Sequence, residues 1–160
     1  MKDNSMLIEK LYLKAVDEKD CDLIFVWANE KENRDNSFNK DKISYIDHKT
    51  WFSKKLTESE DFYILKSYEK NIGQIRLDKA SEGYIISYSI DLQYRGKGYG
   101  KEIIKLLESK MLMSNEPKIL VAYVKPKNIK SIKIFQELNY RESIENNFYK
   151  YIKKIGDSSD

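Results

Sequence analysis

The sequence predicts an α/β fold, in which a single domain has a central mixed, mostly antiparallel sheet flanked by helices. Strand patterns in the middle of the chain are followed by a helix, a strand and a second helix. The length of 160 residues fits one domain. Because no repeat, low-complexity segment or Pro/Gly/Ser-rich linker divides the chain, we assign residues 1–155 to one domain and expect residues 156–160 to form a frayed tail.

The first third of the chain predicts one strand and two helices. Apolar and polar side chains alternate over residues 9–16, which favours a strand, and residues 23–27 have apolar side chains at helical spacing. A polar stretch at 29–42 has little periodicity. Asp47 can then cap a second helix that contains Trp51.

The rest of the chain predicts five strands and two helices. Three strands separated by short turns should pair as a meander, and they cover residues 62–68, 72–77 and 84–90. An amphipathic helix, a continuous apolar strand, a helix capped by Asn128 and a last alternating strand follow at residues 98–113, 119–124, 128–138 and 148–152.

The charge pattern excludes several classes of function. The net charge of +3 arises from 29 basic and 26 acidic residues that are spread along the chain, which gives little support to nucleic-acid binding. No run of about 20 apolar residues is present for a membrane span. The N-terminal residues lack the apolar region of a signal peptide, so we expect a cytoplasmic protein, either a monomer or a homodimer.

Cysteine and histidine each occur once. Cys21 cannot form an internal disulfide, and together with His48 it provides no Cys/His cluster for a metal, so we expect no metal site. Because Cys21 lies among apolar residues of a predicted helix, we interpret it as a small core residue rather than a nucleophile.

A glycine-rich turn provides the strongest functional signal. It lies between a predicted strand and a predicted helix and reads Arg95-Gly96-Lys97-Gly98-Tyr99-Gly100-Lys101. Glycines let backbone N–H groups approach phosphate oxygens, and the N-terminus of the helix favours negative charge. A dinucleotide fingerprint would need glycine at position 101 and a Walker motif would need glycine at position 95, so neither fits. We therefore predict a pyrophosphate site, in preference to a merely structural tight turn.

At this turn the sequence resembles the GNAT superfamily of acetyltransferases, whose signature Arg/Gln-x-x-Gly-x-Gly/Ala is matched by Arg95, Gly98 and Gly100. The order of elements around the turn also agrees, from Tyr12 to Tyr151. The resemblance implies transfer of an acetyl group from acetyl-CoA, as co-substrate, to a small-molecule amine by direct attack.

The resemblance also implies roles for individual residues. The backbone of the strand before the turn would bind the pantetheine arm, and the Ile90 N–H would donate to the thioester carbonyl. The residues implied in cofactor binding are Tyr88, Ser89, Ile90, Arg95, Gly96, Lys97, Gly98, Tyr99, Gly100, Lys101, Asn128 and Ser131. At Phe135 many family members have a tyrosine that protonates the departing thiolate, so another group, a water or no acid at all must serve here.

The acceptor pocket is expected to form around residues 34–52, which combine polar and aromatic side chains. Trp51 taken alone is better explained as a core residue than as a substrate contact. His48 can act as a base towards the incoming amine, since its unperturbed pKa lies near 6.5. A capping or solvent-exposed histidine explains His48 equally well.

The acceptor itself is suggested by a second, less specific resemblance. The stretch Gly73-Gln74-Ile75-Arg76-Leu77-Asp78, with Arg34-x-x-Ser37 and His48-x-x-Trp51, is similar to acetyltransferases of bacterial nonulosonic acid pathways such as that for pseudaminic acid. It implies an amino group on a UDP-linked amino sugar as the acceptor, contacted by residues Arg34, Ser37, His48, Trp51, Gln74 and Arg76. A peptide N-terminus is an alternative acceptor, and a non-catalytic acetyl-CoA-binding module is an alternative function.

Overall fold

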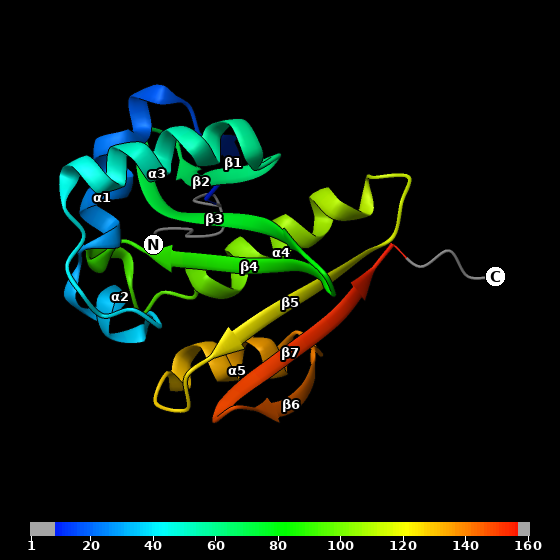
Figure 1. The fold of residues 1–160 in the computed structure, drawn as a ribbon. Helices are drawn as coiled ribbons and strands as arrows, with labels where there is room; N and C mark the ends of the chain where they lie inside the picture. The colour runs from blue at the N-terminus through cyan, green and yellow to red at the C-terminus, as the bar shows by residue number, and fades with distance from the viewer. Residues whose placement is uncertain (1–8, 157–160) are drawn as a thin grey trace, which may run out of the picture.

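A computed structural model describes residues 9–156, in which seven strands form one sheet in the order β1-β2-β3-β4-β5-β7-β6 (Figure 1). The strands are β1 (Leu11–Ala15), β2 (Asp61–Ser67), β3 (Lys70–Ala80), β4 (Gly83–Ile90), β5 (Lys118–Val124), β6 (Arg141–Glu145) and β7 (Phe148–Ile155). All neighbours are antiparallel except β4 and β5, which are parallel. The predicted mixed, mostly antiparallel sheet and its meander are confirmed.

Helices cover both faces of the sheet. They are α1 (Cys21–Ala28), α2 (Lys31–Asn36), α3 (Tyr45–Glu58), α4 (Tyr99–Leu112) and α5 (Ile129–Glu137), with short 3-10 helices η2 (Glu18–Asp20) and η3 (Leu92–Tyr94). The first three helices lie together at one end of the sheet, on one face, and α4 packs against the other face (Figure 1). The frayed tail predicted at residues 156–160 lies, apart from Gly156, outside the described residues.

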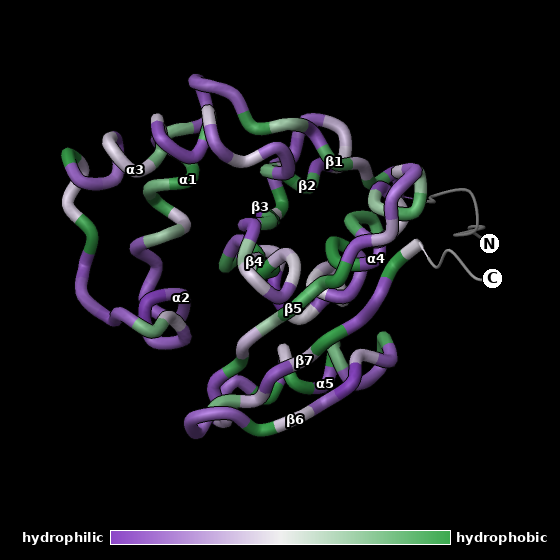
Figure 2. The backbone as a smooth tube through the Cα atoms, turned by 45° about the vertical axis from the view of Figure 1, so that its right-hand side comes forward, coloured by the Kyte–Doolittle hydropathy of each residue, from purple (hydrophilic) through white to green (hydrophobic). Residues whose placement is uncertain are grey.

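Two hydrophobic clusters hold the layers together. The apolar stripe predicted on α4 is confirmed, because Ile103, Ile104, Leu107 and Met111 are all buried in the larger cluster between α4 and the sheet. The smaller cluster joins α1 and α3 to β2 and includes Trp27. Figure 2 shows the hydrophobic stretches of β5 and α4 inside the molecule and the mostly hydrophilic α2 at its periphery.

The structure differs from the prediction where local sequence carries no apolar pattern. Helix α2 lies in the stretch predicted as irregular, and it consists of polar residues only. Strand β6 was not predicted, and every one of its residues is exposed. The cap of α3 is also corrected, because the Ser44 hydroxyl, not Asp47, accepts the hydrogen bond from the Asp47 backbone N–H at 3.2 Å.

Strands β4 and β5 separate after a short parallel contact. Their pairing is limited to Tyr84 with Leu120 and Ile85 with Val121, near the beginning of both strands. The remaining residues of β4 continue to pair with β3 as far as Ile90, while β5 pairs with β7 throughout. The two halves of the sheet therefore diverge, and Figure 1 shows the opening between the ends of β4 and β5.

Candidate active site

Backbone groups at the end of β4 point into the opening beside β5. The Asp91 N–H donates to the Ile72 carbonyl at 2.8 Å, and Ile90 lies opposite Gly73. In an antiparallel pair only every second residue of a strand forms backbone hydrogen bonds with its partner strand. Since Asp91 bonds to Ile72, the residues one and three positions earlier, Ile90 and Tyr88, have their N–H groups directed away from β3. The Ile90 carbonyl, which points the same way, accepts a bond from Arg95 Nε at 2.9 Å. The Ile90 N–H is thus directed towards the opening.

A cavity of about 970 Å³ passes through this opening and reaches both faces of the sheet. We call the part beneath α4 and α5 the α4 side, and the part beneath α1, α2 and α3 the α3 side. The α4 side is lined by Tyr88, Gly96, Gly98, Gly100, Lys101, Asn128, Lys130, Ser131, Lys133 and Phe135. The α3 side is lined by Asn33, Arg34, Ser37, His48, Trp51, Gln74, Arg76 and Ser89, among others.

The three glycines of the turn serve two purposes. Gly96 and Gly98 have φ values of 78° and 87°, in the left-handed region, and a side chain at either position would meet no atom within 4 Å. Open space therefore lies above the turn where an anion can approach the backbone. Gly98 is also the N-cap of α4 and makes no side-chain cap, so the first N–H groups of α4 remain available for an anion. Gly100 instead permits close packing, because a Cβ there would lie 2.8 Å from Ile134.

The side chain of Arg95 does not belong to the α4 side. Its guanidinium contacts Glu30 at 2.5 Å and Glu32 at 2.6 Å, and only 14% of the side chain is exposed. These carboxylates lie at the start of α2, so the arginine ties α2 to the glycine turn. If Arg95 contacts the cofactor, the contact would therefore be made by its backbone.

The remaining predicted side chains of the turn have partners of their own. The Lys97 ammonium lies 5.9 Å from the ring of Tyr94, and Lys101 pairs with Glu137 at 3.6 Å. The Tyr99 hydroxyl donates to Glu9 at 2.6 Å, and this hydrogen bond is the main reason why the pKa of Tyr99 is raised to about 12.

Helix α5 closes the α4 side. The Asn128 side chain caps the helix by accepting from the Ser131 N–H at 3.3 Å, as its position predicts. The Ser131 hydroxyl lies 2.5 Å from the Tyr88 hydroxyl, and burial raises the pKa of Tyr88 to about 12. Phe135 is 1% exposed and stacks on Tyr151 with a centroid distance of 5.3 Å. The structure therefore brings Tyr88, Asn128 and Ser131 together. On this side of the cavity the phenol hydroxyl comes from Tyr88, because Phe135 has none.

His48 is buried, which excludes the solvent-exposed and capping interpretations. It lies within helix α3, is 1% exposed, and its ring centroid is 5.6 Å from that of Trp51. The Nε2 atom lies 2.9 Å from the Cys21 carbonyl, which can only accept, so Nε2 carries a proton. Burial lowers the pKa of His48 below 6.5, although the bond to Cys21 opposes this shift. The neutral ring consequently has its lone pair on Nδ1, the atom that can act as a base.

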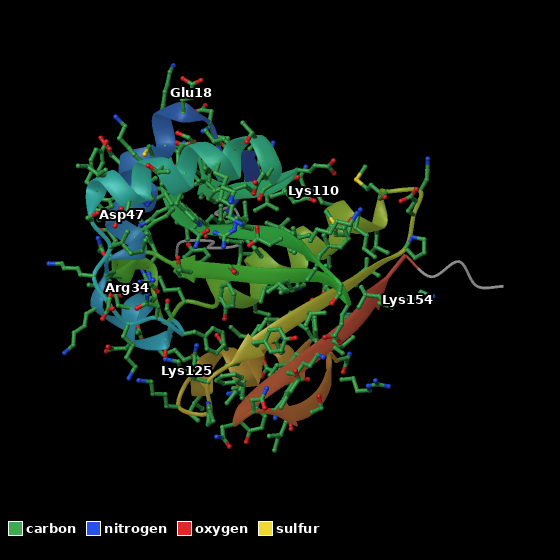
Figure 3. All side chains as sticks on the ribbon, viewed as in Figure 1. Glu18, Arg34, Asp47, Lys110, Lys125 and Lys154 are labelled. Carbon is green, nitrogen blue, oxygen red and sulfur yellow. The ribbon has the colours of Figure 1, made fainter. Side chains whose placement is uncertain are left out.

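Arg34 and Ser37 shape the loop after α2. Arg34 donates to the carbonyls of Asn39 at 3.1 Å and Asp41 at 2.9 Å and to the Ser37 hydroxyl at 3.2 Å. Lys125, which follows β5, donates to the carbonyls of Asp35 and Ser37 at 3.2 and 2.5 Å. Figure 3 shows Arg34 and Lys125 near the end of the molecule where β4 and β5 diverge. The segment from α2 to its loop is therefore held to both halves of the sheet, by Arg95 and by Lys125.

Two side chains of β3 line the α3 side beneath Trp51. The guanidinium of Arg76 lies 4.9 Å from the Trp51 ring centroid, and its Nε donates to Asp78 at 2.9 Å. The Gln74 amide donates from Nε2 to the Ser89 hydroxyl at 3.0 Å. The predicted alternation is confirmed, because Ile75 and Leu77 are buried on the opposite face.

The family follows from a match over most of the sequence. Residues 10–141 match the family model described as an acetyltransferase (GNAT) domain. The chain belongs to the GNAT acetyltransferase family. The resemblance noted at the glycine turn is thereby confirmed, and the matched range contains the turn, the diverging strands and the helix that begins after Asn128.

Solved structures share this GNAT fold. The spermidine N-acetyltransferase of Vibrio cholerae, in complex with CoA and spermine, is 18% identical and has a TM-score of 0.72, with 91% of this chain and 93% of that chain covered. The aminoglycoside acetyltransferase AAC(6')-Ib, in complex with coenzyme A, is 14% identical and has a TM-score of 0.76, with 90% of this chain and 94% of that chain covered. The putative acetyltransferase yncA of Salmonella typhimurium, with acetyl-CoA, is 13% identical and has a TM-score of 0.73, with 94% of this chain and 96% of that chain covered. No curated protein matches the sequence.

Some cavity residues of this GNAT chain were not predicted. Lys130 and Lys133 of α5 line the α4 side. They follow the Asn128 cap and are three residues apart, so they share one face of the helix, and this is the signal that could have found them. Asn33 and Lys125 carry no comparable signal, because their contacts with Arg95 and Ser37 join segments that are distant in sequence. Over residues 9–156 there is no helix long and apolar enough to span a membrane and no group of three His, Cys, Asp or Glu residues suited to a metal.

Proposed function

We propose that the protein transfers the acetyl group of acetyl-CoA to a primary amine by direct attack. The observation that carries this proposal is the pair of features at the end of β4. The Ile90 N–H is directed into the opening, and the open glycine turn with the uncapped start of α4 follows within ten residues. The first feature suits a developing oxyanion and the second suits a pyrophosphate.

The α4 side has the groups needed for coenzyme A. The backbone of residues 96–101 would hold the pyrophosphate, and Lys101, Lys130 and Lys133 would meet the remaining phosphate charge. The backbone of Tyr88 and Ser89 would bind the pantetheine arm between the diverging strands. A cavity of about 970 Å³ has room for this arm together with an acceptor. Support also comes from the neighbours of known structure, which are described with CoA or acetyl-CoA.

The chain's own residues fit attack without a covalent enzyme intermediate. The cavity lining includes no cysteine within the described chain, and Cys21 lies instead at the edge of the α1–α3 cluster. The Ile90 N–H would stabilise the charge on the carbonyl oxygen, and His48 Nδ1 would accept a proton from the amine, directly or through water. A thiol with a pKa near 8.5 is an adequate leaving group as the thiolate. The reaction therefore does not require a tyrosine acid at the position of Phe135.

For the acceptor we propose an amino sugar linked to a nucleotide, bound on the α3 side. Trp51 and Arg76 provide an aromatic and cationic wall, while Gln74, Ser89 and Asn33 provide hydrogen-bonding groups suited to a hydroxylated ring. Arg76 uses Nε for Asp78, which leaves its terminal nitrogens for a phosphate or hydroxyl group. Arg34 uses its terminal nitrogens for the carbonyls of its own loop and for Ser37, which leaves only the buried Nε without a partner, so we expect it to shape the pocket rather than to bind phosphate.

The experiment that tests this function is a panel of amines incubated with acetyl-CoA. It contains UDP-linked 4-amino sugars, aminoglycosides, polyamines and N-terminal peptides, and products are identified by mass spectrometry. We expect acetylation of the amino-sugar nucleotides in preference to the others, in a cytoplasmic enzyme that is a monomer or a homodimer. Turnover of peptides alone would contradict the sugar proposal and leave the acetyl-CoA proposal intact. Binding of acetyl-CoA without turnover of any amine would indicate a binding module.

A further inference from the structure

One buried oxygen on the α3 side has no hydrogen-bond partner among residues 9–156. It is Oε1 of Gln74, the end of the amide opposite to the Nε2 group that donates to Ser89. A buried carbonyl oxygen without a donor destabilises the folded protein, because the oxygen has lost its bonds to water. Gln74 lines the cavity, so a ligand that supplies an N–H or O–H donor would satisfy this oxygen.

The position of Gln74 points to the reacting end of the acceptor. Gln74 and Ser89 are directly opposite each other in the β3–β4 register, and Ser89 precedes Ile90, whose N–H faces the opening. Ser89 anchors the amide through Nε2, which fixes the direction of Oε1. A group that donates to Oε1 from the α3 side therefore lies next to the place where the thioester carbonyl would meet Ile90.

The charged groups around Gln74 disfavour a cation at this place. On β3, Arg76 projects from the same face two residues further along, and Asp78 is neutralised by Arg76 and by Lys55 at 2.9 Å. Glu32 of α2 is paired with Arg95. The other charged or titratable groups that line the α3 side and its rim are Asp47 and His48 of α3, Arg34 of α2, Arg95 after β4, Tyr123 of β5 and Lys125 after β5. Asp47 is the carboxylate of this group that makes no ion pair in the described structure, and it is outnumbered by the cations Arg34, Arg76, Arg95 and Lys125, so the charges on this side disfavour a further cation.

We infer that Gln74 Oε1 accepts a hydrogen bond from the neutral acceptor amine and positions its lone pair for attack, so that the enzyme selects weakly basic amines. The inference rests on the proposed function. A neutral carbonyl oxygen orients an N–H without stabilising the ammonium form as a carboxylate would. In the reaction the nitrogen forms a bond to the thioester carbon, the C–S bond breaks, one amine proton goes to His48 or water, and the thiolate takes up a proton. Gln74 exchanges no proton and is a positioning residue.

The inference separates this enzyme from one adapted to strongly basic amines. An amino group on a sugar ring is flanked by electron-withdrawing oxygens and loses its proton more readily than an alkylamine, whose pKa is near 10.4. An anionic residue would be the better partner for an alkylamine, because it would hold the ammonium ion in the site. The neutral amide at position 74 favours the sugar amine.

The test compares Gln74→Glu, Gln74→Met and the wild type by the dependence of kcat on pH, since kcat reports ionisations of the bound complex. The substrates are a UDP-linked 4-amino sugar and spermidine. We expect Gln74→Glu to move the kcat midpoint to higher pH by about one unit, because a carboxylate stabilises the ammonium form. Gln74→Met should lower kcat about tenfold without moving the midpoint, since it removes an orienting bond only.

Two controls keep the result interpretable. Gln136→Glu introduces the same chemical change on the exposed side of α5, outside the cavity, and should leave the profile unchanged. Acetyl-CoA affinity, measured by calorimetry, should be unchanged in all Gln74 variants that fold. An unshifted profile in Gln74→Glu, or normal kcat in Gln74→Met, overturns the inference even if the sugar is acetylated. Failure of the wild type to acetylate any amine instead overturns the proposed function, so the two failures are distinguishable.

Discussion

The α4 side of the cavity depends on the backbone of one short segment, whereas the α3 side depends on side chains from several separate elements. On the α4 side, Gly96 and Gly98 have positive φ values and the start of α4 presents its N–H groups. On the α3 side, His48, Gln74 and Arg34 come from α3, β3 and α2; His48 and Gln74 are oriented by partners distant in sequence, and Arg34 by the loop that follows α2. The comparison indicates that the anion site can tolerate changes of side chain that the acceptor site cannot.

The largest effect is expected from Gly98→Val, which tests the α4 side. The substitution fills open space above the turn and imposes a branched side chain on a residue with φ of 87°. We expect the Kd for acetyl-CoA, measured by calorimetry, to rise about a hundredfold or more, because the pyrophosphate would lose its approach to the backbone.

The matched control is Gly156→Val. Gly156 also has a positive φ, of 77°, but it lies outside the cavity. Both variants should lose about 1–2 kcal/mol of stability to the left-handed backbone, and only Gly98→Val should lose affinity. Equal losses of affinity would place the cofactor elsewhere.

His48→Gln tests the base on the α3 side. If His48 Nδ1 accepts the amine proton, kcat should fall about a hundredfold, and the acid limb of kcat should lose the ionisation of His48 and keep only that of the bound amine. Wild-type stability should also decrease as the pH falls below about 6.5, because the unfolded His48 binds a proton more readily than the buried one. In a second variant, His48→Phe, the unfolding free energy measured by chemical denaturation should decrease less as the pH falls below about 6.5. A kcat profile of unchanged shape in His48→Gln would leave His48 a purely structural role.

Arg95→Gln tests whether a residue of the glycine turn serves the opposite side. Since the guanidinium binds Glu30 and Glu32, its loss should loosen α2 and raise the KM for the amine about tenfold, with a loss of about 2 kcal/mol in unfolding free energy. The Kd for acetyl-CoA should change far less. Lys97→Gln, in the same turn but exposed, provides the comparison. If Arg95→Gln weakened acetyl-CoA binding as much as amine binding, the division into two sides would be wrong.

The smallest effect is expected from Phe135→Tyr. The ring is enclosed by Tyr151 and Tyr140, at centroid distances of 5.3 and 4.9 Å, but it also lines the cavity. The added hydroxyl should keep kcat within about threefold of the wild type and change the stability by about 1 kcal/mol or less, provided that it reaches the cavity. Thermal melting and steady-state kinetics give both values. A loss of stability well above this would show that the hydroxyl is buried without a partner.

The parts of the fold that were predicted are those whose pattern is local. Helix α4 has an apolar stripe at helical spacing, and β5 is a continuous apolar run, so each element carries its own signal. Helix α2 and strand β6 carry none, because their side chains are polar and their burial is slight. Pairing with β7, which follows after two residues, produces β6 although β6 has no apolar pattern. Ion pairs with Arg95 hold α2, and Arg95 lies 63 positions after Glu32.

The candidate site divides in the same way. The sequence by itself determined the glycine turn that we propose as the anion site, since the positive φ values of Gly96 and Gly98 and the start of α4 follow from residues within one turn of each other. Only the tertiary structure decided where the guanidinium of Arg95 goes, that His48 is buried against Cys21, and that Gln74 presents an oxygen without a partner. Each of these depends on contacts between residues 15 to 65 positions apart, which the pairing of β3 with β4 and the packing of α1, α2 and α3 create and no local pattern records.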